Sequence, residues 1–281
     1  MSNVFRALEK AEREKQIPSL KAEPLIELVD VKPIESKNNG PVLKDLVKEI
    51  EKFDLPGVGE ESISVAENSS FAAEQFRKMK THIFRISPSP PRCILVTSTV
   101  PQEGKSTITM NLAMSIAQEM HKKVIVIDAD LRNPSIYPTK FANKKGLSDY
   151  LSDETPISEV LKSFNGERYV VIPAGAPSHK AAELIGSNKM KALIKALRDM
   201  DQETFILIDS PPILATSEPL MLSEWVDGVI LVVGADNAPR GSIKKAFGGI
   251  DPKKIIGIVF NNKNLKPSKG YSDYYYRYHK K

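Results

Sequence analysis

The chain has 281 residues, of which 41% are hydrophobic, so it is long enough for one large α/β domain with extensions. No stretch approaches the roughly 18 to 20 apolar residues that a membrane span needs, and no signal-peptide core opens the sequence. The single cysteine, Cys93, excludes a disulfide framework and fits a reducing compartment, so we expect a cytoplasmic protein.

The net charge of +5 is concentrated at one end of the chain. Lysine and arginine exceed aspartate and glutamate by 40 to 35, and residues 263–281 alone hold six basic residues against one acidic residue. The remaining sequence is therefore neutral on balance. This distribution argues against a broad nucleic-acid-binding face, and we expect no nucleic-acid partner.

The first 70 residues divide into two segments. Residues 1–17 predict an amphipathic helix with one narrow apolar stripe, which would dock either on the body of the protein or on a partner. Residues 18–70 contain five prolines and predict a largely irregular linker, with a short helix plausible only at 42–53.

Helical spacing returns at residues 71–86. Three charged residues recur three positions apart on this segment, namely Glu74, Arg77 and Lys80. Spacing alone favours a solvated charged face. Three prolines, at positions 88, 90 and 91, follow this helix.

Residues 93–107 predict a buried strand, a polar loop and the start of a helix. The loop ends in Gly104-Lys105-Ser106-Thr107, the second half of a phosphate-loop motif whose first glycine is replaced by Thr99. Backbone N–H groups of such a loop and the following helix dipole form an anion site. The expected nucleotide-binding residues here are Gln102, Glu103, Gly104, Lys105, Ser106 and Thr107.

Beyond this loop, continuous apolar runs alternate with helical patterns. Strands are predicted at 123–128, 169–172, 204–209, 228–233 and 255–260. Helices are predicted at 105–120, 157–163, 188–199, 219–225 and 242–247. This alternation predicts a doubly wound, mainly parallel α/β sheet with its ligand at the carboxyl ends of the strands.

Carboxylates follow two of these strands. Asp128 and Asp130 end one strand and Asp209 ends another, on the edge that carries the phosphate loop. Lys105 would hold the β and γ phosphates, and Ser106, Asp128 and Asp209 form the expected Mg²⁺ site, Asp209 acting through water. Asp128 or Asp130 would take the proton from an attacking hydroxyl. Arg132 would pair with one of these carboxylates or reach a phosphate.

The C-terminal segment, residues 263–281, is basic and rich in tyrosine. Five tyrosines fall within eight residues: Tyr271, Tyr274, Tyr275, Tyr276 and Tyr278. Stacking on single-stranded nucleic acid or a structural terminal strand are alternatives. A flexible tail of phosphate-accepting hydroxyls is favoured, because the nucleotide site would supply the other reactant.

Taken together, these features resemble the bacterial tyrosine kinase (BY-kinase) family, in particular its cytoplasmic CpsD/CapB-like members. Residues 101–107 look like the family's Walker A motif, residues 128–134 its Walker A′ and residues 208–212 its Walker B. Segments 146–151, 227–233 and 257–261 also fit, and Asn261 matches a position near the nucleotide base. Glu74, Arg77 and Lys80 are similar to the family's E-x-x-R-x-x-R oligomerisation motif, with lysine in the last place.

The resemblance implies a P-loop domain at residues 71–262 that uses ATP and Mg²⁺. It further implies a ring or other homo-oligomer whose subunits phosphorylate each other's tails, regulating exopolysaccharide or capsule production. A membrane adaptor of the polysaccharide co-polymerase type, which recruits the protein to the inner face of the plasma membrane, and a protein-tyrosine phosphatase are the implied partners. The departures are Gln102 in place of glycine, Ser210 in place of threonine and a different sequence at 179–181.

Two other functions remain open on this sequence. A MinD/ParA-type ATPase switch shares the fold, but it carries a second lysine early in the loop, where this chain has Val100 and Pro101, and it has no use for the tyrosines. A nucleotide-binding scaffold without catalysis is the third possibility, because Gln102 departs from the family's loop.

Overall fold

The computed structural model describes residues 71–134, 145–152, 155–164, 168–235 and 239–261. The N-terminal helix, the linker and the tyrosine-rich tail expected from the sequence lie outside these residues. No helix in the described part of the chain is long and apolar enough to cross a membrane.

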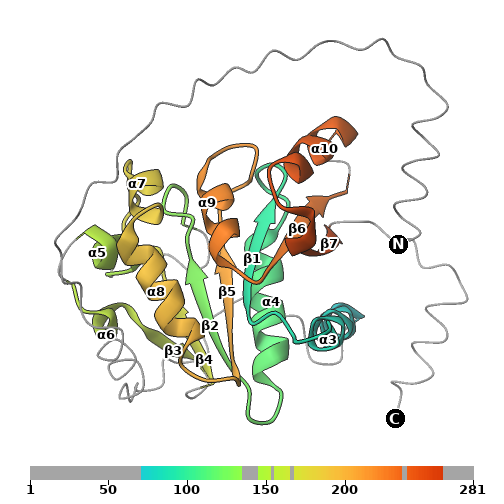
Figure 1. The fold of residues 1–281 in the computed structure, drawn as a ribbon, viewed down its shortest axis with the longest axis horizontal. Helices are drawn as coiled ribbons and strands as arrows, with labels where there is room; N and C mark the ends of the chain where they lie inside the picture. Colours follow the sequence, from blue (N-terminus) through green and yellow to red (C-terminus); the bar gives the residue numbers. More distant parts are fainter. Residues whose placement is uncertain (1–70, 135–144, 153–154, 165–167, 236–238, 262–281) are drawn as a thin grey trace, which may run out of the picture. The chain divides into compact units, whose positions relative to one another are not determined.

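A seven-stranded sheet forms the centre of the domain, in the order β3-β4-β2-β5-β1-β6-β7 (Figure 1). Its strands are β1 (Cys93–Ser98), β2 (Lys123–Asp128), β3 (Lys162–Phe164), β4 (Tyr169–Ile172), β5 (Thr204–Asp209), β6 (Gly228–Gly234) and β7 (Ile255–Asn261). Every pairing is parallel except that of β3 with β4. The doubly wound, mainly parallel sheet predicted from the sequence is therefore confirmed.

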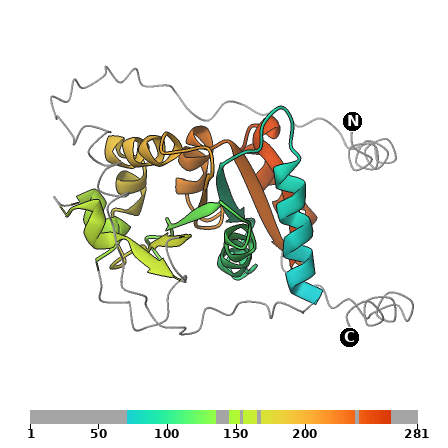
Figure 2. The ribbon, with the colours of Figure 1, turned by 90° about the horizontal axis from the view of Figure 1, so that it is seen from below.

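Helices cover both faces of the sheet (Figure 2). On one face lie α3 (Phe71–Phe84) and α4 (Lys105–Ala117), whose apolar side chains pack with alternate residues of the strands. The other helices pack into a second cluster: α5 (Leu147–Ser152), α6 (Ile157–Val160), α7 (Ala181–Ile185), α8 (Asn188–Arg198), α9 (Glu218–Trp225) and α10 (Arg240–Gly248). A short 3₁₀ turn, η2 (Pro252–Lys254), precedes β7.

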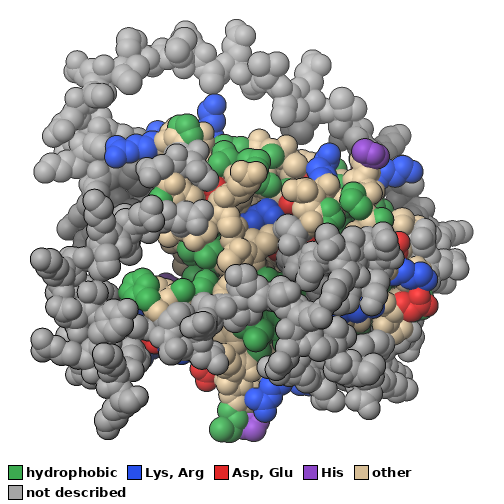
Figure 3. Space-filling view, turned by 180° about the vertical axis from the view of Figure 1, so that it is seen from behind, with side chains coloured by type: hydrophobic (Ala, Val, Ile, Leu, Met, Phe, Trp, Pro, Cys, Tyr) green, Lys and Arg blue, Asp and Glu red, His purple; other side chains and the backbone are tan. Residues whose placement is uncertain are grey.

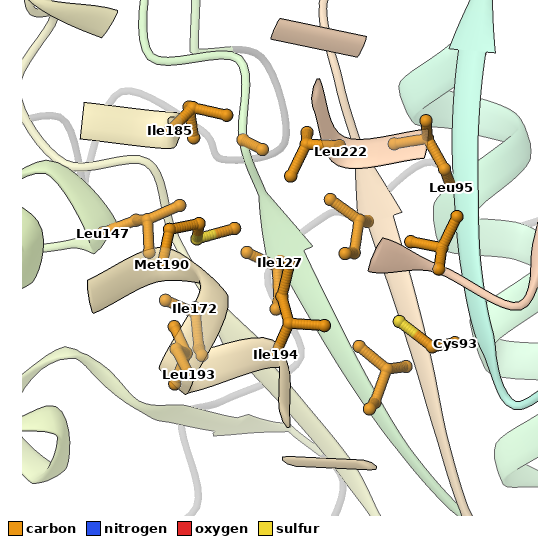
Figure 4. Close-up of a cluster of buried hydrophobic side chains, with 14 of the residues drawn as sticks. Cys93, Leu95, Ile127, Leu147, Ile172, Ile185, Met190, Leu193, Ile194 and Leu222 are labelled. Carbon is orange, nitrogen blue, oxygen red and sulfur yellow. The ribbon is translucent and has the colours of Figure 1, made fainter. Parts of the chain in front are cut away.

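The second cluster contains most of the largest buried side chains. Figure 4 shows Ile127 and Ile172 of the sheet facing Met190, Leu193 and Ile194 of α8. Burial of this apolar area provides the main stabilisation of the domain. In the view from behind (Figure 3), hydrophobic, basic and acidic side chains of the described residues are interspersed on the surface.

Strand register aligns the catalytic candidates at one edge of the sheet. Asp128 of β2 lies opposite Asp209 of β5, and Asp209 in turn lies opposite Val96 of β1. Because β1, β2 and β5 are parallel neighbours, their carboxyl ends meet at one edge, where the phosphate loop leaves β1.

The prediction of a helix at 157–163 was wrong over its last three residues. The helix α6 ends at Val160, because Leu161 adopts an extended conformation and Lys162–Phe164 pairs antiparallel with β4. The local spacing predicted a longer helix, but residues 162–164 lie beside β4 at the edge of the sheet. Pairing with β4 forms backbone hydrogen bonds that a further helical turn would not form. The short helices α5 and α7, of six and five residues, were not predicted by spacing.

Candidate active site

The phosphate loop connects β1 to α4, and the side-chain carboxylate of Glu103 fixes its position. One carboxylate oxygen of Glu103 accepts a hydrogen bond from the N–H of Val100 at 2.9 Å, and the other accepts one from Gly234 at 2.8 Å. The side chain is fully buried. The side chain of Glu103 therefore ties the loop to the end of β6, and its predicted contact with nucleotide falls to the backbone N–H.

Asn261, the last residue of β7, also contacts this loop. Its Nδ2 donates to the backbone oxygen of Glu103 at 2.9 Å. A Cβ atom at Gly104 would lie 2.1 Å from the same Nδ2, and Gly104 has a left-handed φ of 85°. Both the close approach and the backbone conformation therefore require glycine here.

Gln102 stands in the exposed part of the loop with φ of 64°. This left-handed conformation is one that glycine adopts at no steric cost and that other residues adopt at some cost. Gln102 thus keeps the loop conformation at the position where glycine is usual in the BY-kinase family that the sequence resembles. Thr107 is also exposed, one helical position beyond Ser106.

Lys105 and Ser106 meet the strand-end carboxylates directly. The Nζ atom of Lys105 lies 3.0 Å from Oδ2 of Asp130 and 3.6 Å from Oδ2 of Asp209. The hydroxyl of Ser106 donates to Oδ2 of Asp209 at 2.5 Å. Burial lowers the pKa of Lys105, but the charges of Asp209 and Asp130 outweigh it and raise the pKa above the ordinary value. Lys105 is therefore a permanent cation at this site.

Asp128 and Asp209 are crowded buried acids. Burial and the charge of Asp209 raise the pKa of Asp128 to about 8. Burial also raises the pKa of Asp209 to about 6, although Lys105 and the hydrogen bond from Ser106 act in the opposite direction. The Oδ1 atom of Asp130 accepts a hydrogen bond from the backbone N–H of Asn133, and the backbone N–H of Asp130 donates to Oδ1 of Asp128. The side chains of Asp128, Asp130 and Asp209 thus form one connected cluster with Lys105.

The site fits a divalent cation that is bound jointly with phosphates. The Oδ1 atom of Asp209 is buried without a hydrogen-bond partner, next to the hydroxyl of Ser106. No group of three or more His, Cys, Asp or Glu side chains in the described residues is arranged to hold a metal by itself. Mg²⁺ in phosphoryl-transfer sites keeps several waters and takes one or two protein ligands together with substrate phosphates, which this donor set matches.

Arg132 pairs with Glu218, a residue that the sequence did not single out. Its Nε lies 2.7 Å from Oε1 of Glu218, whose side chain is fully buried, while Arg132 remains 46% exposed. Burial raises the pKa of Glu218, but the hydrogen bond from Arg132 outweighs it and the pKa is lowered. The position of Glu218 at the start of α9, 86 residues after Arg132, gave no local signal.

The three charged residues of α3 do not act alike. Arg77 and Glu74 form an ion pair of 2.6 Å along the helix. Lys80 is buried and pairs with Glu119, just beyond the end of α4, so it holds α3 against the domain. Of the expected oligomerisation residues, only Glu74 and Arg77 therefore present polar groups at a half-buried surface. The five tail tyrosines lie outside the described residues.

A strand, a phosphate loop, a helix and two strand-end carboxylates at the carboxyl edge of a parallel sheet define the class of P-loop nucleotide-binding proteins. The family model described as an AAA domain matches residues 94–241. The chain is 32% identical over 216 residues to the tyrosine-protein kinase YwqD of Bacillus subtilis, covering 75% of this chain and 90% of that protein. It is 30% identical over 205 residues to the tyrosine-protein kinase CpsD of Streptococcus agalactiae, covering 72% and 87%. The chain belongs to the bacterial tyrosine-protein kinase family.

Solved structures agree with this assignment. The chimerical protein CapA2B2 aligns with a TM-score of 0.64 at 28% identity, covering 79% of this chain and 99% of that one. The kinase domain of VpsO aligns with a TM-score of 0.60, also at 28% identity, covering 69% and 95%.

Proposed function

We propose that this protein is an ATP-dependent tyrosine autokinase that transfers the γ-phosphoryl group of ATP to tail tyrosines of a neighbouring subunit. The observation that carries the proposal is the cluster of Lys105, Ser106, Asp128, Asp130 and Asp209 beneath the phosphate loop. The acceptors are Tyr271, Tyr274, Tyr275, Tyr276 and Tyr278.

The nucleotide phosphates would be held by the loop amides, the N-terminus of α4 and the charge of Lys105. Asp130 positions Lys105 through their 3.0 Å ion pair. Ser106 and Asp209 would hold Mg²⁺, which when bound neutralises charge that develops on the phosphate oxygens. Asn261 keeps the loop in place from β7, and Arg132, directed by Glu218, is the further cation available to a phosphate.

In the transfer itself, the tyrosine oxygen forms a bond to the γ-phosphorus while the bond from that phosphorus to the bridging oxygen breaks. ADP leaves with the bridging oxygen, and the product is phosphotyrosine. The phenolic proton passes to the carboxylate of Asp128. A pKa of about 8 suits this role, because an efficient general base has a pKa near the working pH.

The wider organisation follows from the family and belongs to the same proposal. Glu74 and Arg77 of α3, which Lys80 holds against the domain, contribute to assembly of a ring or other homo-oligomer, in which the tails of residues 263–281 reach neighbouring sites. A membrane adaptor of the polysaccharide co-polymerase type recruits the protein to the inner face of the plasma membrane, and a protein-tyrosine phosphatase resets it. The kinase domain spans residues 71–262, preceded by the linker at 18–70 and the helix at 1–17. The output is regulation of exopolysaccharide or capsule synthesis and export.

The test uses the full chain with γ-labelled ATP and Mg²⁺. We expect phosphotyrosine at residues 271–278 by mass spectrometry, and none in Lys105→Met. A matched control replaces the five tail tyrosines by phenylalanine, which should remove the label and leave nucleotide binding unchanged. ATP hydrolysis without any tail label in the native chain would overturn the kinase assignment in favour of a MinD/ParA-type switch. Binding without either reaction would identify a silent scaffold.

A further inference from the structure

A second pocket lies at the edge of the sheet opposite the active site. Its volume is about 670 Å³, and its walls come from the segments that lead into β1, β2, β5, β6 and β7. These are the lower ends of the strands in Figure 1, whereas the phosphate loop follows the upper end of β1. The volume falls in the range of about 300 to 1,000 Å³ that is usual for small-ligand sites.

The lining of this pocket is strongly basic. Five cations contribute to it against the single carboxylate of Asp227, namely Arg92, Lys122, Arg198, Lys253 and Lys254. Carboxylates partly compensate two of them, because Arg198 pairs with Asp227 at 2.5 Å and Lys122 pairs with Glu203.

Two of the other three cations, Arg92 and Lys254, are held by groups that carry no charge. The guanidinium of Arg92 donates to the backbone oxygens of Asp201 and Arg198. The Nζ of Lys254 donates to those of Ser223 and Glu224, at 2.8 and 2.7 Å. Carbonyl oxygens fix the positions of these side chains but do not neutralise them. A pocket in which cations outnumber carboxylates, and in which carbonyl oxygens hold two of the cations in place, is suited to a dianion rather than to a neutral ligand.

The same pocket has an apolar wall. Pro90, Pro91, Phe205, Val226 and Ile256 line it beside the cations. A ligand that combines a flat apolar ring with a doubly charged group would use both parts. Phosphotyrosine has these two features, and its phosphate carries about −1.5 to −2 charges at neutral pH. Recognition of phosphorylated side chains by clusters of basic residues is a recurring mode.

We propose that this pocket binds phosphotyrosine from the C-terminal tail of this chain or of a neighbouring copy. The inference rests on the proposed function, because autophosphorylation is what would generate the ligand. Chain length permits docking within one subunit. Tyr271 lies ten positions after Asn261, and this stretch of chain spans up to about 33 to 36 Å when extended. The seven residues of β7, which lead from the pocket to the phosphate-loop edge, span only about 23 Å.

Such docking would hold the product tail at the far edge of the sheet. A phosphorylated tail bound there is removed from the Lys105 cluster, so it no longer competes with an unmodified tail for that site. The unmodified tail would therefore bind at the carboxyl edge of the sheet, and the phosphorylated tail would bind at the opposite edge.

The experiment measures binding of a synthetic peptide of residues 270–281, phosphorylated at Tyr274, Tyr275 and Tyr276, to the full chain carrying five tail tyrosine-to-phenylalanine substitutions. Fluorescence anisotropy at physiological salt should give at least tenfold tighter binding than for the unphosphorylated peptide. The double variant Lys122→Gln/Lys253→Gln, both at the pocket surface, should weaken binding at least tenfold. The matched double variant Lys191→Gln/Lys195→Gln on exposed positions of α8 should not.

Three results would overturn the proposal. Equal affinity for both peptides would exclude phosphotyrosine recognition. Loss of binding in Lys105→Met, but not in the pocket variant, would place the peptide in the active site. Pocket variants that weaken binding to phosphatidylglycerol vesicles, but not to the phosphopeptide, would identify a lipid-facing surface instead. Because the peptide is synthetic, these outcomes do not depend on whether the chain labels its own tail.

Discussion

The hydroxyl of Ser106 donates to Oδ2 of Asp209 at 2.5 Å, although 103 residues separate them in the chain. The other oxygen of Asp209 is buried and has no hydrogen-bond partner. This pair joins the first turn of α4 to the end of β5, so the donors for a divalent cation are assembled before any nucleotide binds. Preassembly of this kind reduces the reorganisation that binding would otherwise require.

The first prediction concerns metal dependence. In the native chain, ADP with Mg²⁺ should raise the melting temperature well above the value with ADP and EDTA, because a ligand that binds only the folded state stabilises it. In Asp209→Asn this Mg²⁺-dependent increment should nearly vanish. Asp199→Asn, an exposed carboxylate at the end of α8, serves as the control and should keep the increment. An undiminished increment in Asp209→Asn would remove Asp209 from the metal site.

The second prediction concerns pH. Burial and Asp209 raise the pKa of Asp128 to about 8, whereas the unfolded chain has the ordinary value of about 4. Between these values the folded protein binds more protons at this carboxyl than the unfolded chain does. The contribution of Asp128 to stability therefore falls as the pH rises from about 4 to about 8.

Asp128→Asn removes this titration. Without nucleotide or metal, the melting temperature of the variant minus that of the native protein should increase steadily from pH 5 to pH 8, by differential scanning fluorimetry. Asp199→Asn, at an exposed carboxylate just after α8, should give a difference that does not follow this trend. A flat difference across the range for Asp128→Asn would show that Asp128 is not the proton-binding group.

The third prediction addresses the anchor beneath the phosphate loop. Glu103→Ala leaves the N–H groups of Val100 and Gly234 without an acceptor. Two hydrogen bonds to a carboxylate, one buried and one part-buried, correspond to about 3 to 6 kcal/mol of the free energy of unfolding. Urea denaturation should show this loss, and Glu103→Gln, which retains one acceptor oxygen, should lose less. Equal losses in the two variants would argue against the bridging role.

The fourth prediction concerns Gln102. Its left-handed backbone costs a non-glycine residue about 1 kcal/mol, and glycine costs about 0.5 to 1 kcal/mol in the entropy of the unfolded chain. The two effects nearly cancel, so Gln102→Gly should change stability by less than about 1 kcal/mol. Gln102→Val should destabilise, because a β-branched residue tolerates this conformation poorly.

His121 offers a matched comparison, since it has φ of 66° in an exposed turn far from the loop. His121→Gly should resemble Gln102→Gly in stability. If Gln102→Gly alone changes ADP affinity, measured by calorimetry, then the departure from the family's glycine tunes nucleotide binding. If neither variant does, Gln102 is a tolerated substitution.

The fifth prediction concerns Arg132 and Glu218. Glu218 is fully buried and Arg132 is its charged partner, so Arg132→Ala should destabilise the protein by about 1 to 2 kcal/mol, less than for a fully buried pair because Arg132 is half-exposed. In the Glu218→Gln background the same substitution should have little effect. A double-mutant cycle by urea denaturation measures this coupling. Additive losses would mean that the two side chains stabilise the fold independently.

Much of the fold followed from local pattern. The continuous apolar runs identified β1, β2, β4, β5 and β6, because strands buried on both faces have no polar alternation. The run of β7 also predicted a strand, but β7 is an edge strand and its Phe260 is 65% exposed. The edge strand β3 could not be found this way, because three residues carry too little pattern and their pairing with β4 depends on tertiary proximity. The phosphate loop was likewise evident from Gly104-Lys105-Ser106 and its flanking strand and helix.

By itself, the sequence determined the sheet class, the phosphate loop and the presence of acids at the strand ends. Only the tertiary structure decided what those acids and their neighbours do. In the folded protein the buried carboxylate of Glu103 holds the phosphate loop, and Arg132 pairs with Glu218 rather than with an aspartate. Lys80 is buried and pairs with Glu119. Spacing specifies which side of a strand or helix a residue faces, but hydrogen bonds and ion pairs between residues 39 to 131 positions apart depend on which elements pack together.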